Sequence, residues 1–481
     1  MIHRTFIQSG NPINGYLRSG SVTALAPRSL AYYDSEIDRR ALPWFYRTAW
    51  GTLLCALYPL FAIAPMVSVH ALNRDAGYSM VTELGIDCAQ VGFALLSMQF
   101  VLTARLPWIE APFGLDVVLR FHRAMAFVIL ALLCAHPLLI ASDEGWRLVT
   151  KFHANWYIWT GRSALILLIL QVTTALLRSV MRLSYERWRR AHNVIALAIL
   201  ALGFIHAVTT GQDLDNAPGL TLWALAPALA LAAWLYARGI RPYLLARRSF
   251  RVLSTRLEAA RVWSVTLEAP SGRPFRFLPG QFQFLRFLDS NVPSEEHPFT
   301  IASSPSRPDR ITLTIKASGD FTSLIDRIKV GDRATVHGPF GRFSHDLHPD
   351  EGDLVFIAGG VGITPLMSML RAMRDRREPR QVTLIYPSRK LDDILFILEL
   401  FSLEAGQYPS LKVIYVLSQP PSWWTGETGR IDAPRLDQWC GGLAGKAFYL
   451  CCPPQMNVEL MRGLRNRGVN QRRIHCDYFS L

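Results

Sequence analysis

The sequence predicts a multi-domain fold: a six-helix all-α transmembrane bundle, then an antiparallel β-barrel domain and an α/β doubly wound domain. Three patterns predict this order. Long apolar segments fill the first half, strands of alternating polarity follow, and strands that alternate with helices complete the chain. We place the boundaries at 1–45 for a polar N-terminal segment on the cytosolic side, 46–243 for the bundle, 247–347 for the barrel and 352–481 for the doubly wound domain.

Six apolar segments are each long enough to cross the roughly 30 Å hydrocarbon core of a bilayer. They lie near residues 47–68, 86–104, 119–141, 157–178, 190–210 and 220–240. The loops at 105–120 and 178–190 are rich in arginine, whereas the loops between the other ends hold few cations. Because arginine marks the cytosolic side, we expect both termini in the cytosol and a multi-pass protein of a bacterial inner or plasma membrane, in contact with lipid.

Four histidines occupy two of these segments. His122 and His136 lie in the third and His192 and His206 in the fifth, with the same spacing of fourteen residues. Fourteen helical residues make just under four turns, so each pair shares one face about 21 Å apart. Facing helices would oppose the histidines in two layers, and two facing imidazoles can bind a haem iron. A histidine in an apolar helix is more often a packing residue, but four without partners would be costly to bury.

A barrel is indicated by strands near residues 250–256, 261–268, 282–288, 311–316 and 333–337. Pro279-Gly280 and the run Gly338–Gly341 are expected to be turns between them. Alternating strands with turn residues at this spacing are typical of a small antiparallel barrel.

The last part of the chain alternates between strands and helices. Strands are expected at 354–358, 382–386, 411–417 and 447–451, and helices at 365–374, 394–403 and 456–467. This alternation is typical of a parallel, doubly wound sheet that binds nucleotides.

Glycines after the first of these strands form a candidate phosphate-binding turn. Such a turn lets the backbone approach a pyrophosphate at a helix N-terminus, although a plain tight turn has the same composition. The residues predicted to bind the dinucleotide are Gly359, Gly360, Gly362, Thr364 and Pro365. Ser388 and Arg389 follow the second strand, where an adenosine ribose is expected, and would suit the 2′-phosphate of NADPH. A solvated basic turn is the alternative, and NADH stays open.

Two tetrapeptides in the barrel region suit a flavin. An aromatic ring beside a hydroxyl can stack on an isoalloxazine and bond its edge, as in His297, Pro298, Phe299 and Thr300. A second stretch precedes a short helix whose amides could bind the flavin pyrophosphate. The further candidate FAD-binding residues are Lys316, Gly319, Phe321 and Thr322.

These motifs, with Pro279–Phe282 and Tyr449–Met456, come in the order of ferredoxin-reductase-type dehydrogenase domains. Joined to six spans with paired histidines, the chain resembles the NADPH oxidase and ferric reductase superfamily of membrane flavocytochromes b. The resemblance implies FAD, two b-type haems and NADPH as cofactors. It also implies that Cys451 lies near the nicotinamide and that Phe479 covers the flavin. Cys452 departs from the family glycine, and Ser480 and Leu481 follow Phe479.

The resemblance implies an oxidoreductase that passes electrons from NADPH through FAD and the haems to an extracytoplasmic acceptor. The acceptor stays open between dioxygen, which gives superoxide, a ferric chelate, and an extracytoplasmic protein partner. A membrane-anchored flavin reductase without haem is the remaining alternative. The net charge of +14 does not indicate nucleic acid, because no basic run is interleaved with aromatic residues and the positive-inside rule explains it. Seven cysteines without a C-x-x-C pair indicate no disulfide framework.

Overall fold

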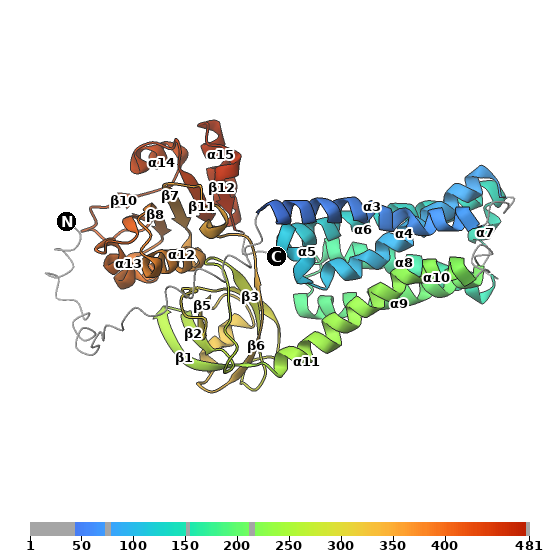
Figure 1. Cartoon of the computed structure of the whole chain (residues 1–481), viewed down its shortest axis with the longest axis horizontal. Coiled ribbons are helices and arrows are strands. Elements are labelled where there is room, and N and C mark those ends of the chain that lie inside the picture. The colour runs from blue at the N-terminus through green and yellow to red at the C-terminus, as the bar shows by residue number, and fades with distance from the viewer. Residues whose placement is uncertain (1–43, 73–77, 151–153, 211–216, 478–481) are drawn as a thin grey trace. The chain divides into compact units, whose positions relative to one another are not determined.

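The computed structural model describes residues 44–72, 78–150, 154–210 and 217–477 (Figure 1). The chain divides into two compact units, Met1–Ala49 and Trp50–Leu481. In the first unit only the beginning of helix α3 is described, so the predicted N-terminal segment lies almost wholly outside the described residues. The paragraphs below concern the second unit.

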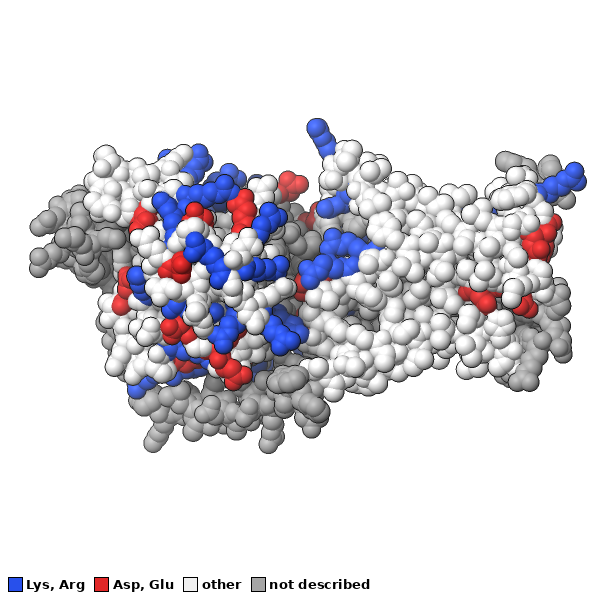
Figure 2. All heavy atoms as spheres, turned by 90° about the horizontal axis from the view of Figure 1, so that it is seen from above, with Lys and Arg blue, Asp and Glu red and all other residues white. Residues whose placement is uncertain are grey.

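Six helices of the described chain are long and apolar enough to cross a membrane, as predicted. They are α3 (Trp44–Leu72), α4 (Met80–Thr103), α6 (Leu115–Glu144), α8 (Trp156–Leu177), α9 (Tyr185–Thr210) and α10 (Ala217–Leu235), which continues through a π-helical turn (Tyr236–Ile240) into α11 (Arg241–Ala246). Short helices α5 (Pro107–Phe113) and α7 (Arg147–Thr150) lie between them. In Figure 2 the visible face of this bundle is almost free of charged side chains between its two ends, as a lipid-facing surface requires.

Helix pairs build the bundle: α4 packs along α6, and α8 packs along α9 (Figure 1). Two glycines allow close approach of helices, Gly92 between α4 and α6 and Gly203 between α9 and α4. A Cβ on Gly92 would lie 2.9 Å from the side chain of Leu133, and one on Gly203 would lie 2.7 Å from the ring of Phe93. Small residues at such crossings let membrane helices make van der Waals contact, which is a main source of their association in lipid.

A six-stranded antiparallel sheet follows the bundle. It contains β1 (Phe250–Ala259), β2 (Val262–Glu268), β3 (Phe282–Phe287), β4 (His297–Thr300), β5 (Arg310–Lys316) and β6 (Arg333–Phe340), in the order β4-β3-β6-β1-β2-β5. A single bridge between Ile301 and Leu313 joins the residue after β4 to β5. The antiparallel sheet is therefore confirmed, while full closure into a barrel stays a prediction. The expected turn at Gly338–Gly341 was wrong over its first three residues, because β6 runs on to Phe340, which pairs with Phe282 of β3 beyond an irregularity in the register.

A six-stranded parallel sheet completes the chain, in the order β10-β9-β8-β7-β11-β12. Its strands are β7 (Leu354–Ala358), β8 (Gln381–Ser388), β9 (Ser410–Leu417), β10 (Glu427–Thr428), β11 (Ala447–Cys451) and β12 (Ile474–Cys476). Helices α12 (Ile363–Arg376), α13 (Ile397–Glu404), α14 (Ala433–Cys440) and α15 (Pro454–Asn466) connect them. The doubly wound fold is thus confirmed. The sequence patterns missed α14, β10 and β12, which are short elements.

Candidate functional site

The structure brings the four membrane histidines together as two facing pairs. The rings of His122 and His192 have centroids 6.5 Å apart, and those of His136 and His206 are 6.4 Å apart. In each pair α6 supplies one imidazole and α9 the other. We call His122 and His192 the inner pair and His136 and His206 the outer pair, after the expected orientation of the chain.

The spacing within each pair fits a metal ion between two imidazoles. A bond from metal to imidazole nitrogen is roughly 2 Å long. With the distance from that nitrogen to the ring centre, two such bonds put the centroids about 6.3 Å apart. Both observed spacings lie within a few tenths of an ångström of that value. The residues present therefore fit a bis-histidine haem iron in each layer.

The two candidate flavin motifs meet through stacked rings. His297 stacks on Phe321 with centroids 4.1 Å apart and an interplanar angle of 27°. Phe299 lies 6.3 Å from Phe321 in a nearly parallel plane, and Thr300 is buried at the end of β4. Pro298 is exposed on the same strand. Two of these rings come from β4 and the third from the turn before a 3-10 helix, and together they offer aromatic surface to a planar cofactor.

The side chain of Thr322 stabilises the turn that is predicted to bind the flavin pyrophosphate. The backbone amides of Ser318 and Gly319 donate to Oγ1 of Thr322, at 3.0 and 2.9 Å. The 3-10 helix Thr322–Arg327 begins there, as expected for a short helix after the motif. Lys316 ends β5 with an exposed side chain. The hydroxyl of Thr322 therefore holds this turn in its conformation.

Glu296, directly before His297, was missed by sequence reasoning. Its carboxylate accepts from Arg105 at 2.9 Å and from Arg189 at 3.4 Å, and His337 Nδ1 lies 3.8 Å away. Burial alone would raise the pKa of Glu296, but the nearby His337 and the charges of the two arginines hold this pKa well below its ordinary value. A lone glutamate in a loop carries no sequence signal for such a cluster, since its partners lie far away in the chain.

The glycine turn packs directly against the strand end at Cys451. A Cβ on Gly362 would lie 2.0 Å from the carbonyl oxygen of Cys451, and one on Gly359 would lie 2.7 Å from Pro453. The amide of Gly359 donates to the Cys451 carbonyl at 2.9 Å. Gly360 has a φ of +57°, a left-handed conformation that favours glycine. The predicted phosphate turn and the predicted nicotinamide position thus meet at the carboxyl ends of β7 and β11.

Other predicted residues of this region are less open to a ligand. Thr364 and Pro365 are buried in α12, which begins two residues before the proline, and Oγ1 of Thr364 donates to the Val361 carbonyl. Ser388 ends β8 and Arg389 is exposed just beyond it. These two residues lie at the carboxyl edge of the sheet, where the ribose was expected.

Cys451 and Cys452 are both buried, and burial raises the pKa of each thiol, that of Cys452 to about 12. Cys452 is not among the described non-glycine residues with positive φ. Its replacement of the family glycine therefore brings no left-handed strain, and its side chain packs in the hydrophobic core beside β11. Phe479 lies outside the described residues.

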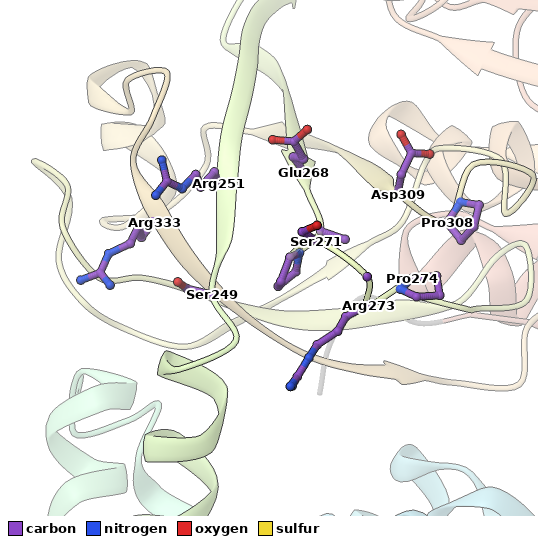
Figure 3. Close-up of a pocket in the computed structure, with 12 residues that line it drawn as sticks. Ser249, Arg251, Glu268, Ser271, Arg273, Pro274, Pro308, Asp309 and Arg333 are labelled. Carbon is purple, nitrogen blue, oxygen red and sulfur yellow. The ribbon is translucent and has the colours of Figure 1, made fainter.

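A pocket of about 660 Å³ opens elsewhere on the antiparallel sheet (Figure 3). Its lining mixes cations with carboxylates and contains none of the predicted site residues. The charged and hydroxyl residues among the lining are Ser249, Arg251, Glu268, Ser271, Arg273, Asp309 and Arg333. The candidate site is therefore not this pocket but the two histidine pairs together with the flavin and glycine motifs.

Three family models match the chain in the order of its domains. The ferric reductase like transmembrane component matches residues 88–203, the FAD-binding domain matches residues 247–340 and the oxidoreductase NAD-binding domain matches residues 356–460. The chain belongs to the ferric reductase and NADPH oxidase superfamily. The chain therefore combines a ferric-reductase-like membrane component with the FAD- and NAD-binding domains of an oxidoreductase.

Curated relatives match a little under half of this superfamily member. The Stachydrine N-demethylase reductase subunit Stc4 of Rhizobium meliloti (strain 1021) is 28% identical over 228 residues, which cover 46% of this chain and 64% of Stc4. The NADH--cytochrome b5 reductase 1 of Arabidopsis thaliana is 30% identical over 228 residues, 46% of this chain and 81% of that protein. The chain thus spans less than two thirds of Stc4, and likewise 59% of the phenol 2-monooxygenase reductase component DmpP of Pseudomonas sp. (strain CF600). The solved structure of Amycolatopsis cytochrome P450 reductase GcoB matches with a TM-score of 0.43 and 24% identity, over 48% of this chain and 69% of GcoB.

Proposed function

We propose that this oxidoreductase carries electrons from NADPH across the membrane to an extracytoplasmic acceptor, either dioxygen or a ferric chelate. When bound, FAD would take a hydride from NADPH and release single electrons, which two b-type haems would carry through the bilayer. The observation that carries this proposal is the pair of facing histidine layers at 6.5 and 6.4 Å. A flavin reductase that merely sits on a membrane has no use for four matched imidazoles in its spans.

The soluble half supplies the binding surfaces for this reaction. The rings of His297, Phe299 and Phe321 would hold the flavin, and Thr300 would reach its edge. The turn around Gly360 would bind the NADPH pyrophosphate, with its nicotinamide end beside Cys451. Because burial raises the pKa of the Cys451 thiol, this side chain stays protonated and presents a neutral surface to the nicotinamide. Phe479 would cover the opposite side of the flavin.

The inner pair supplies the entry point for electrons on the cytosolic side. Glu296 precedes the flavin strand, and its partner Arg189 lies one helical turn before His192 on α9. This ion pair ties the flavin motif to the helix end that carries the inner pair. The outer pair lies fourteen residues further along each helix, about 21 Å from the inner pair. Electrons would cross this distance between the two haems.

An absorption spectrum of the purified protein tests the proposal. NADPH added without oxygen is expected to produce a reduced-minus-oxidised spectrum with a haem Soret band and bleached flavin absorbance. Admitting oxygen or a ferric chelate as the sole oxidant should then reverse the spectrum, with superoxide or trapped ferrous iron as the product. Reversal only by an added extracytoplasmic protein would favour the protein-acceptor alternative. A protein that is yellow but lacks any Soret band would overturn the proposal.

A further inference from the structure

The outer pair is held by the backbone of neighbouring helices. Nδ1 of His136 donates to the carbonyl of Gly85 on α4 at 2.9 Å, and Nδ1 of His206 donates to the carbonyl of Tyr157 on α8 at 2.9 Å. A carbonyl oxygen can only accept, so each Nδ1 carries the proton and each Nε2 keeps its lone pair. Both outer rings are thus fixed in one tautomer and in one orientation.

The inner pair lacks this support. Nδ1 of His122 and Nδ1 of His192 are buried and have no hydrogen-bond partner among the described residues. The neighbour of the His192 ring is Trp188, whose ring centroid lies 5.0 Å away, and the indole nitrogen of Trp188 is itself without a partner in the described chain. The two pairs therefore have nearly the same ring spacing, but only the rings of the outer pair are oriented by hydrogen bonds to the backbone.

Helix α8 also fixes the face of one outer ring. A Cβ on Gly161 would lie 2.8 Å from three ring atoms of His206, namely Cε1, Cγ and Nδ1. Gly161 is one helical turn after Tyr157, so the carbonyl that accepts from the ring and the gap that admits it lie on the same side of α8. Any side chain at position 161 would push the ring away from its acceptor.

We propose that Gly161 and the carbonyls of Tyr157 and Gly85 are positioning elements that preorganise the outer haem site, whereas the inner site takes its ring orientation from the bound group. This inference rests on the proposed function, because it assigns the histidine layers to haem. A hydrogen bond from Nδ1–H to a carbonyl makes an imidazole a stronger donor, and loss of such a partner typically weakens metal binding by roughly 10- to 100-fold. The stronger donor would also favour the ferric state of a haem iron bound at the outer pair.

The test places Gly161→Ala in two full-length backgrounds that each keep one histidine pair. The outer-only background carries His122→Ala and His192→Ala, and the inner-only background carries His136→Ala and His206→Ala. Each protein is prepared without haem and titrated with hemin. In the outer-only background Gly161→Ala is expected to weaken hemin binding by roughly 10- to 100-fold and to raise the midpoint potential of what still binds. In the inner-only background it is expected to change neither quantity, which also shows that the bundle folds.

Gly92→Ala is the matched control, because its Cβ would crowd a helix crossing at 2.9 Å from Leu133 without touching a histidine. It should leave hemin binding and potential unchanged in the outer-only background. Equal effects of Gly161→Ala in both backgrounds, no effect in either, or an equal effect of Gly92→Ala would each overturn the inference while leaving the proposed function intact. A wild-type protein that binds no hemin would overturn both.

Discussion

The imidazole of His297 stacks on the ring of Phe321, although the two residues come from separate motifs of the flavin-binding domain. Phe321 is also part of the hydrophobic core of this domain, so it links folding to cofactor binding. The contact explains how a strand end and a loop come to form one surface.

Phe321→Leu should weaken FAD binding while keeping the domain folded. Leucine keeps most of the buried apolar area but removes the stacked ring, and an aromatic pair is worth about 0.5–1.5 kcal/mol beyond its buried area. We therefore expect FAD affinity to fall roughly 2- to 10-fold. Phe277→Leu makes the same change at another buried ring of this core and should retain flavin. Equal flavin loss in both variants, measured as flavin per protein, would show that only core packing matters.

Gly362→Ala should slow NADPH oxidation by roughly 100-fold without loss of FAD. The added Cβ would meet the Cys451 carbonyl at 2.0 Å, so the glycine turn must move away from the end of β11. Hydride transfer depends on the relative position of nicotinamide and flavin, and a shift of about 1 Å can cost roughly 100-fold in rate. Gly352→Ala, where nothing lies within 4 Å of the added Cβ, is the matched control and should retain wild-type kcat. Stopped-flow measurement of flavin reduction checks both variants.

Arg389→Ala should reduce the preference of the protein for NADPH over NADH. Arg389 is exposed at the carboxyl end of β8, and a hydrogen bond to a charged phosphate is worth about 1.5–3 kcal/mol. We expect kcat/KM to fall roughly 10- to 100-fold with NADPH and to stay unchanged with NADH. Arg430→Ala, an exposed arginine paired with Glu459, should change neither value. An equal loss with both cofactors would mean that Arg389 does not contact the 2′-phosphate.

Glu351→Gln should destabilise the nucleotide-binding domain in a pH-dependent way. The carboxylate of Glu351 accepts from Tyr449 at 2.7 Å and from His475 at 2.6 Å, which fixes β12 beside β11. Burial alone would raise the pKa of Glu351, but these hydrogen bonds lower it below its ordinary 4.5. A depressed carboxyl pKa adds stability above pH 4.5 that is lost as the pH falls below it.

The variant is expected to lose about 1–3 kcal/mol of its free energy of unfolding at pH 7, the usual contribution of one buried hydrogen-bonded charge. Its free energy of unfolding should also depend less on pH between pH 5 and the acid transition. Thermal unfolding followed by flavin release measures both effects. Glu459→Gln, at a solvent-exposed ion pair, should change stability by less than about 1 kcal/mol. A Glu351→Gln protein whose unfolding curves at pH 7 and at pH 5 match those of the wild-type protein would contradict this account.

Sequence patterns predicted the parts of this fold that depend on long periodic segments. Apolar length alone located all six spans, and strand–helix alternation located the parallel sheet. The spacing of His122 and His136 likewise predicted which side chains share a face, because helical geometry fixes it. Short elements such as β12 and α14 were missed, since three to eight residues carry too little periodicity.

Tertiary contacts of the site could not be read from local patterns. The donation of His206 to the Tyr157 carbonyl depends on how α8 crosses α9, and the partners of Glu296, Arg105 and Arg189, lie far away in the chain. In the sequence, Gly161 looks like any other glycine of an apolar helix. Only the structure shows that the His206 ring lies beside it. Cys452 in place of the family glycine suggested a less extreme backbone angle or a looser nicotinamide fit, and its backbone lies outside the left-handed region.

The central claim is that electrons cross the membrane from the inner to the outer histidine pair. The most direct measurement is anaerobic reduction by NADPH of the wild-type protein and of His136→Ala, followed by mixing with acceptor. Two haems per chain should become reduced in the wild-type protein. In the variant a single haem should be reduced at the wild-type rate but should no longer pass electrons to oxygen or ferric chelate. Undiminished acceptor reduction by His136→Ala would contradict the account.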